Sequence, residues 1–113
     1  EWDKVLKDKP HKDIIDLVRL LHTKYQIIIM TGRDGICYQD TKEWLKVLEI
    51  PYDRFFMRNK GDFRKDSIIK SEKYMDDIRS HYDVKYVLDD RDQVVNMWRD
   101  IGLRCLQVAP GKF

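Results

Sequence analysis

The chain has 113 residues, with 22 Lys or Arg against 20 Asp or Glu and a net charge of +2. A charge this balanced excludes a simple polycation that coats nucleic acid or membranes by charge alone. With 42% apolar and 12% aromatic residues, the composition is that of a folded protein and not of a disordered segment. The longest fully apolar run is 27–30, so no segment is predicted to span a bilayer.

Helices and strands are predicted to alternate along the chain. In chain order we predict helix 13–24, strand 25–30, helix 38–48, strand 54–57, helix 65–81, strand 84–88, helix 93–101 and strand 104–108. Loops are predicted at 31–35 and 58–64, and Gly102 is expected to end the last helix. Trp44 and Trp98 occur at helical core spacing, which favours packing over base stacking. This order predicts an α/β fold with a parallel sheet covered on both faces.

Two cysteines, Cys37 and Cys105, are far apart and form no Cys-x-x-Cys pair. We therefore expect two reduced thiols in a cytosolic protein, and no zinc site.

Polar residues follow three of the predicted strands, where parallel α/β sheets bind their ligands. They are Thr31, Gly32 and Arg33 after the first strand, Arg58, Arg64 and Lys65 after the second, and Asp89 and Asp90 after the third.

Four of these residues suit a phosphate. The Thr31 hydroxyl can donate to a phosphate oxygen, and Gly32 lets backbone N–H groups approach one. The Arg33 guanidinium can bind phosphate through two N–H groups. Lys65 adds a positive charge at the head of a helix, where the helix dipole also favours anions.

The acidic pair Asp89 and Asp90 offers hard oxygen ligands that suit Mg²⁺. Each feature alone has a plainer interpretation, because Thr-Gly-Arg is a common turn, Asp-Asp-Arg-Asp can begin a helix, and Lys65 can be a solvated helix residue. Their order on successive strand ends instead favours phosphoryl transfer, which needs a metal, a lysine and a hydroxyl at one phosphoryl group.

The same residues resemble the later motifs of the haloacid dehalogenase (HAD) phosphatase superfamily. Thr31 stands at the second-motif Ser/Thr, Lys65 at the third-motif Lys, and Asp89 with Asp90 at the fourth-motif acids. Four segments together closely resemble the phosphatase domain of phage-type polynucleotide kinase-phosphatase. They are 31–33, 61–66, 88–99 and 105–108. The resemblance covers residues 13–113 and implies a Rossmann-like, three-layer parallel sheet of HAD type.

This resemblance implies a phosphatase that removes 3′ phosphates from DNA or RNA ends with Mg²⁺, through an aspartyl-phosphate intermediate. Thr31 would bind the transferring phosphoryl group, and Lys65 would stabilise the attacked phosphate and the intermediate. Asp89 and Asp90 would build the metal site, one of them binding Mg²⁺ directly. The residues implied to hold the phosphate or the strand are Gly32, Arg33, Arg58, Arg64 and Arg91.

The nucleophilic Asp of that family and its general acid–base Asp are absent from this sequence. In the family both lie in an Asp-x-Asp-Gly-Thr motif, and no such motif occurs here. The strand that carries it lies mid-sheet in the superfamily, between the strands ending here at Met30 and Leu88. Its removal leaves two half-sheets with unpaired inner edges, which is costly. We therefore expect residues 1–113 to be a partial HAD phosphatase domain that does not fold alone, completed by an N-terminal segment with this strand and the nucleophile.

Three hypotheses for function follow. The first is a cytoplasmic polynucleotide 3′-phosphatase, alone, as a homo-oligomer, or beside a fused or separate 5′-kinase domain. The second is a HAD phosphatase acting on nucleotides or small phosphorylated metabolites. The short connection from Thr31 to the helix at 38 leaves no room for a large cap, which favours a macromolecular substrate. The third is a non-catalytic module that binds nucleic-acid ends or a protein partner, disfavoured because Thr31, Lys65, Asp89 and Asp90 are all present.

Overall fold

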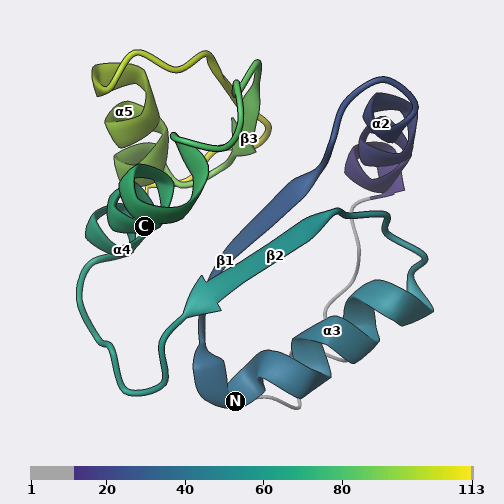
Figure 1. The fold of residues 1–113 in the computed structure, drawn as a ribbon, viewed down its shortest axis with the longest axis horizontal. Helices are drawn as coiled ribbons and strands as arrows, with labels where there is room; N and C mark the ends of the chain where they lie inside the picture. Colours follow the sequence, from purple (N-terminus) through teal and green to yellow (C-terminus); the bar gives the residue numbers. More distant parts are fainter. Residues whose placement is uncertain (1–11, 113) are drawn as a thin grey trace. The chain divides into compact units, whose positions relative to one another are not determined.

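Two α/β units make up the chain, residues 1–62 and 63–113, and the computed structural model describes residues 12–112. The first unit contains α2 (Lys12–His22), β1 (Ile28–Asp34), the short 3₁₀ helix η1 (Gly35–Cys37), α3 (Tyr38–Val47) and β2 (Arg54–Arg58) (Figure 1). The second contains α4 (Asp66–Lys73), the π-helical turn η2 (Tyr74–Ile78), β3 (Val87–Asp89), α5 (Asp92–Asp100) and β4 (Cys105–Gln107). The predicted alternation of helices and parallel strands is confirmed.

The sheet of the first unit consists of β1 and β2, which pair in parallel with Ile29 opposite Phe55 and Thr31 opposite Met57. Because side chains alternate across a strand, Phe55 and Met57 share one face of this sheet. Met57 is buried with Cys37, and Trp44 of α3 packs against them. The amphipathic helix α3 therefore covers the face that Phe55 and Met57 share, and Trp44 has the predicted packing role.

Helix α2 is held to the rest of the first unit by polar contacts near its C-terminal end. Arg19 Nη2 donates to the Leu48 carbonyl at 2.7 Å. His22 Nε2 lies 3.7 Å from the Asp53 carboxylate, which also accepts from the Ile27 N–H at 2.6 Å. None of the residues of α2 is fully buried.

The sheet of the second unit pairs β3 with β4 in parallel, with Val87 opposite Cys105 and Asp89 opposite Gln107. Helix α5 packs against both strands and α4. Its buried side chains Val94, Val95 and Trp98 form the core with Ile69 of α4. Gly102 has a φ of +95° directly after α5, which fits its predicted role as the end of that helix.

Several predicted boundaries are wrong: the strands predicted to start at 25 and 84 start at Ile28 and Val87, and the helix predicted to end at 24 ends at His22. Two further differences change the kind of structure. Residues 31–34 are not a loop, because β1 continues to Asp34 beside β2, with a register shift between Thr31 and Asp34. Such a shift is a β-bulge, which lets Gly32 and Arg33 stay within the strand without partners opposite them. The helix predicted at 65–81 changes type at Tyr74, where the Arg79 N–H bonds the Tyr74 carbonyl five residues back. Apolar spacing does not distinguish such a π-helical turn from an α-helix.

The strands do not form the single sheet that their order predicts. In the part of the chain that the structure describes, they form two separate two-stranded sheets, β1 with β2 and β3 with β4. That a central strand is missing between two half-sheets stays a prediction.

Cys37 and Cys105 are both buried free thiols, one in each unit. None of the helices described between residues 12 and 112 is long and apolar enough to cross a bilayer.

Candidate functional site

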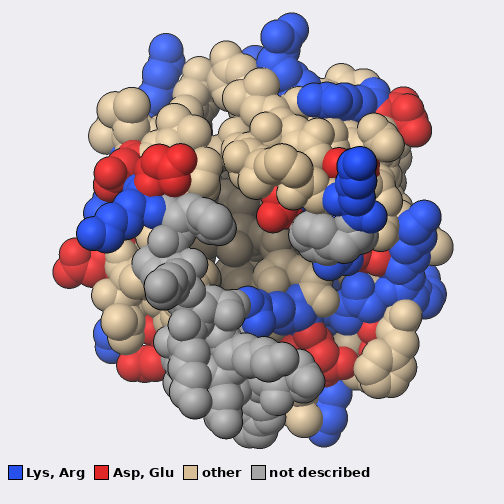
Figure 2. Space-filling view, turned by 180° about the vertical axis from the view of Figure 1, so that it is seen from behind, with Lys and Arg blue, Asp and Glu red and all other residues tan. Residues whose placement is uncertain are grey.

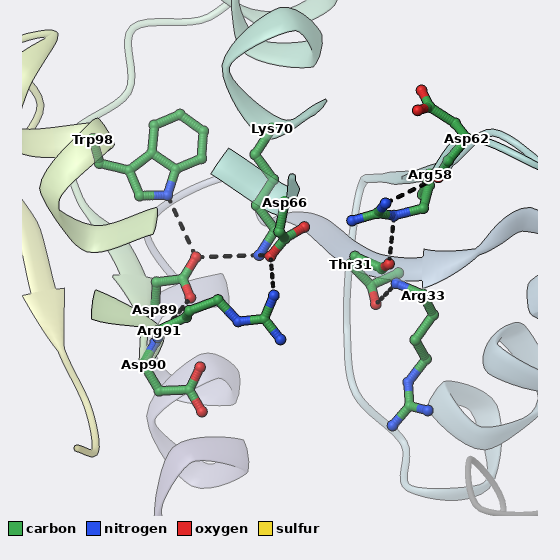
Figure 3. A network of polar contacts seen from close by, with 11 residues as sticks. Thr31, Arg33, Arg58, Asp62, Asp66, Lys70, Asp89, Asp90, Arg91 and Trp98 are labelled. Atoms are coloured by element: carbon green, nitrogen blue, oxygen red, sulfur yellow. Dashed lines mark hydrogen bonds and ion pairs between the residues drawn. The ribbon is translucent and has the colours of Figure 1, made fainter. Parts of the chain in front are cut away.

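A partly buried carboxylate, that of Asp89, ends β3 in the second unit. Its Oδ1 accepts from the backbone N–H of Asp90 at 2.9 Å and of Arg91 at 3.4 Å. Its Oδ2 accepts from Lys70 Nζ at 3.3 Å and from Trp98 Nε1 at 3.4 Å (Figure 3). Only 11% of the side chain is exposed. Donors on both oxygens therefore fix the orientation of this carboxylate.

Lys70 of α4 is the cation of this group. Its Nζ lies 3.4 Å from the Asp66 carboxylate and 3.3 Å from that of Asp89, and its side chain is 10% exposed. The second cation, Arg91, approaches the same Asp66 carboxylate at 3.5 Å (Figure 3). A buried ammonium is tolerated when carboxylates compensate its charge, and here two do so.

Lys65, the lysine predicted to stabilise the phosphate, lies elsewhere in the same unit. It is exposed at the N-cap of α4, and its side chain makes no capping hydrogen bond. Within the described residues, the lysine that contacts Asp89 is Lys70, which was not predicted from the sequence. The available signal was the spacing of Asp66 and Lys70, four residues apart on a predicted helix, which places them on one face.

Asp90 differs from its neighbour because it is exposed. An exposed carboxylate is free to bind Mg²⁺, whereas the oxygens of Asp89 already accept four hydrogen bonds. Residues 12–112 hold no group of three or more His, Cys, Asp or Glu placed as a metal site. Asp90 thus offers one carboxylate ligand for Mg²⁺, and the remaining ligands would have to be water, substrate or residues outside this range.

The segment 107–111 holds the backbone of this acidic turn in place. Gln107 Nε2 donates to the Asp90 carbonyl at 3.0 Å and to Asp92 Oδ1 at 2.6 Å. The Asp92 N–H donates to the Gly111 carbonyl at 2.6 Å. Gly111 packs so closely that a Cβ on it would lie 2.0 Å from the Asp90 carbonyl oxygen. The sequence analysis assigned this segment only to the end of regular structure.

The first unit gathers the predicted phosphate-binding residues at the β-bulge. Thr31 Oγ1 accepts from the Arg33 N–H at 3.2 Å, and Arg58 Nε donates to the Gly32 carbonyl at 2.8 Å. The Arg58 guanidinium also donates to the Asp62 carbonyl at 2.9 Å. Arg33 extends its side chain away from Arg58 (Figure 3). The two carbonyl contacts show that Arg58 shapes the bulge.

Asp34 ties the end of β1 to the loop that follows β2. Its carboxylate accepts from the N–H of Ile36 at 2.9 Å and of Gly61 at 3.1 Å. These backbone donors, Ile36 first, hold the pKa of Asp34 below its ordinary value of 3.8. A Cβ on Gly35 would lie 2.9 Å from the Arg58 carbonyl oxygen, so only glycine allows this close approach.

Each unit therefore brings together the predicted residues that it contains, with two exceptions. Thr31, Gly32, Arg33 and Arg58 meet in the first unit, and Asp89, Asp90 and Arg91 meet in the second. The exceptions are Lys65, which is exposed at the N-cap of α4, and Arg64, which forms a double ion pair with Glu72 at 2.6 and 2.8 Å.

Comparison with known proteins confirms the family expected from the motifs. Residues 1–113 match the family described as the polynucleotide kinase PNKP phosphatase domain. A protein of Autographa californica nuclear polyhedrosis virus, named "Putative bifunctional polynucleotide kinase/RNA ligase", is 37% identical over 102 residues. The match covers 88% of this chain and 15% of the viral protein.

Two solved structures are also similar. The first, titled "Structure of Pnkp1/Rnl/Hen1 complex", gives a TM-score of 0.93 at 34% identity and covers 99% of this chain and 40% of that one. The second, titled "Structure of the Pnkp1/Rnl/Hen1 RNA repair complex", gives 0.90 at 36% identity and covers 93% and 34%. The chain spans less than half the length of each of these relatives.

Proposed function

Because the chain belongs to the family of polynucleotide kinase PNKP phosphatase domains, we propose that it removes 3′ phosphates from polynucleotide ends. The titles of its relatives name an RNA ligase and an RNA repair complex, so RNA ends are the first substrate to test. The observation that carries the proposal is the buried Lys70 beside Asp89, at the carboxyl end of a parallel strand. Enzymes that act on phosphate esters need such a fixed positive charge next to a metal-binding carboxylate.

In this proposal the residues of the second unit have separate roles in binding the metal and the phosphoryl group. Asp90 binds Mg²⁺ through its exposed carboxylate, and Asp89 orients Lys70 toward the phosphoryl group. Bound Mg²⁺ would neutralise charge on the phosphoryl oxygens. Lys70 takes the role that the sequence analysis gave to Lys65, and the exposed Lys65 contacts the nucleic-acid strand.

The first unit supplies donors to the phosphate. The Thr31 hydroxyl and the backbone N–H groups of the bulge donate to phosphoryl oxygens, and Arg33 provides a positive charge. Arg58 acts as a positioning residue, because both carbonyls that it binds belong to this unit.

The nucleophile must come from outside these 113 residues, because no Asp-x-Asp-Gly-Thr motif occurs among them. An aspartate carboxylate would attack phosphorus while the bond to the 3′ oxygen breaks, and a second carboxyl group would protonate that oxygen. Water would then hydrolyse the aspartyl phosphate and release inorganic phosphate.

The test is phosphate release from a 3′-phosphorylated oligoribonucleotide by the complete natural protein, with and without Mg²⁺. We expect release that requires Mg²⁺, is lost in Lys70→Met and is kept in Leu20→Ala, a change at an exposed residue of α2. A protein that hydrolyses small phosphate esters but not this oligonucleotide would contradict the proposal.

A further inference from the structure

Phe63 is the most exposed large apolar side chain that the structure describes, at 86%. Scattered exposed apolar residues are normal on a protein surface, so exposure alone implies no role. The surroundings of this ring are what distinguish it.

The backbone on both sides of Phe63 is held by hydrogen bonds or ion pairs. On the N-terminal side, the Asp62 carbonyl accepts from Arg58, and the Asp62 N–H donates to the Asn59 carbonyl at 3.0 Å. On the C-terminal side, Arg64 forms its double ion pair with Glu72 of α4. The ring therefore extends into solvent from a residue whose two neighbours in the chain are held in place.

Two exposed lysines, Lys60 and Lys65, flank the ring in the chain. Residues 58–65 also contain Arg58 and Arg64 against one acid, Asp62. Arg64 is paired with Glu72, so the two lysines are the cations that the ring's surroundings offer to a ligand. Basic and acidic side chains are mixed over the face that Figure 2 shows. An exposed aromatic ring among cations is the arrangement with which proteins bind single-stranded nucleic acid, since a base stacks on the ring and cations attract the phosphates. The two exposed lysines disfavour a protein partner, because lysine is depleted in protein–protein interfaces, whereas the ring and the arginines would suit either kind of partner.

We propose that Phe63 stacks on a base of the polynucleotide whose 3′ phosphate the domain removes. The inference rests on the proposed function. Phe63 follows directly after Asp62, whose carbonyl is bound by Arg58, and Arg58 also binds the Gly32 carbonyl at the β-bulge. The ring therefore follows, by one position in the chain, the residue that Arg58 joins to the β-bulge. Because every base has an aromatic face, the contact tolerates any sequence.

The test measures binding separately from hydrolysis, in the complete natural protein. The Kd of a fluorescent, 3′-phosphorylated single-stranded RNA is measured by anisotropy for the wild type and for Phe63→Ala, Phe63→Leu and Phe63→Trp. We expect Phe63→Ala and Phe63→Leu to raise the Kd by roughly 5- to 100-fold, and Phe63→Trp to bind like the wild type. The matched control is Leu20→Ala, an exposed apolar residue in α2, which should leave the Kd unchanged.

Hydrolysis gives the second readout. Phe63→Ala should raise KM for the oligonucleotide and leave kcat/KM for a small phosphate ester unchanged, because the ester has no base to stack. An unchanged Kd in Phe63→Ala overturns the inference, as it would if the ring served a protein partner. Wild-type binding by Phe63→Leu, or loss of small-ester hydrolysis in Phe63→Ala, also overturns it. If the wild type binds the RNA but releases no phosphate, the proposed function fails while the Kd series still tests the stacking.

Discussion

Lys65 and Lys70 lie five positions apart, yet the structure gives them different surroundings. Lys65 is exposed at the start of α4, whereas Lys70 is buried between Asp66 and Asp89. Only a lysine held in one place can provide a preorganised charge for a phosphoryl group, because an exposed one is solvated and mobile.

Replacing each lysine by methionine separates the two roles. We expect Lys70→Met to lower kcat by about 10²-fold or more, the effect typical of removing a preorganised electrostatic contact. It should also lower the melting temperature, because two buried carboxylates lose their cation. Lys65→Met should change mainly KM for the oligonucleotide. Steady-state kinetics and thermal melts of both variants test these expectations. A larger loss of kcat in Lys65→Met than in Lys70→Met would show that Lys65 stabilises the phosphoryl group, as predicted from the sequence.

The two neighbouring aspartates should also respond differently to substitution. Asp90→Asn should raise the Mg²⁺ concentration needed for half-maximal activity with little effect on stability, because Asp90 is exposed. Asp89→Asn should lower the melting temperature, because Lys70 then loses one of its two charged partners. Activity titrated against Mg²⁺ and thermal melts test this. The reverse pattern would make Asp89 the direct metal ligand.

The lowered pKa of Asp34 predicts that the stability of the fold depends on pH in the acidic range. Because its folded-state pKa is lowered by the N–H groups of Ile36 and Gly61, the ionised carboxylate stabilises the fold above pH 3.8, and this contribution is lost as the pH falls through the folded pKa. A ¹³C NMR titration of the carboxyl group should therefore have its midpoint below 3.8. A midpoint at or above that value would show that these N–H groups do not stabilise the charged form.

At the scale of elements, segment 107–111 holds the backbone of the acidic turn in place, although most of this segment lies outside regular structure. Gly111 and Gly102 form a matched pair to test it. A Cβ at Gly102 would meet nothing within 4 Å, so Gly102→Ala should cost only about 1 kcal/mol for its positive φ. Gly111→Ala must displace the backbone of Asp90 and Arg91, so we expect it to lower kcat as well as stability. Melts and kinetics of both variants measure this, and unchanged kcat in Gly111→Ala would show that the acidic turn tolerates the shift.

The sequence predicted elements better than their contacts. Apolar spacing located the helices, and the order of polar residues located the acidic turn, because both signals are local in the chain. The bulge in β1 depends on pairing with β2, and the burial of Lys70 depends on Asp89, 19 residues later. Such features arise from contacts between distant segments, which a single sequence does not display. For the same reason, the close approach of Gly111 to the Asp90 carbonyl was not predicted from the sequence.

At the scale of the whole molecule, the unpaired strand edges are the main feature. Among the described residues, β1 and β3 each pair on one side only, since each sheet has two strands. Isolated two-stranded sheets are marginally stable, and unpaired edges attract other strands. A further strand would satisfy such an edge, and the segment predicted to carry the nucleophile is itself a strand.

A polypeptide of residues 1–113 should not behave as a complete domain. We expect it to melt without a cooperative transition or to self-associate through its strand edges, because each sheet has only two strands. Extending it by the segment of the natural protein that carries an Asp-x-Asp-Gly-Thr motif should restore a cooperative melt and phosphatase activity together, since one strand supplies both. Calorimetry and analytical ultracentrifugation of the two polypeptides test this. A cooperative melt of monomeric residues 1–113 would show that the fold needs no further strand, and the nucleophile would then have to be sought apart from it.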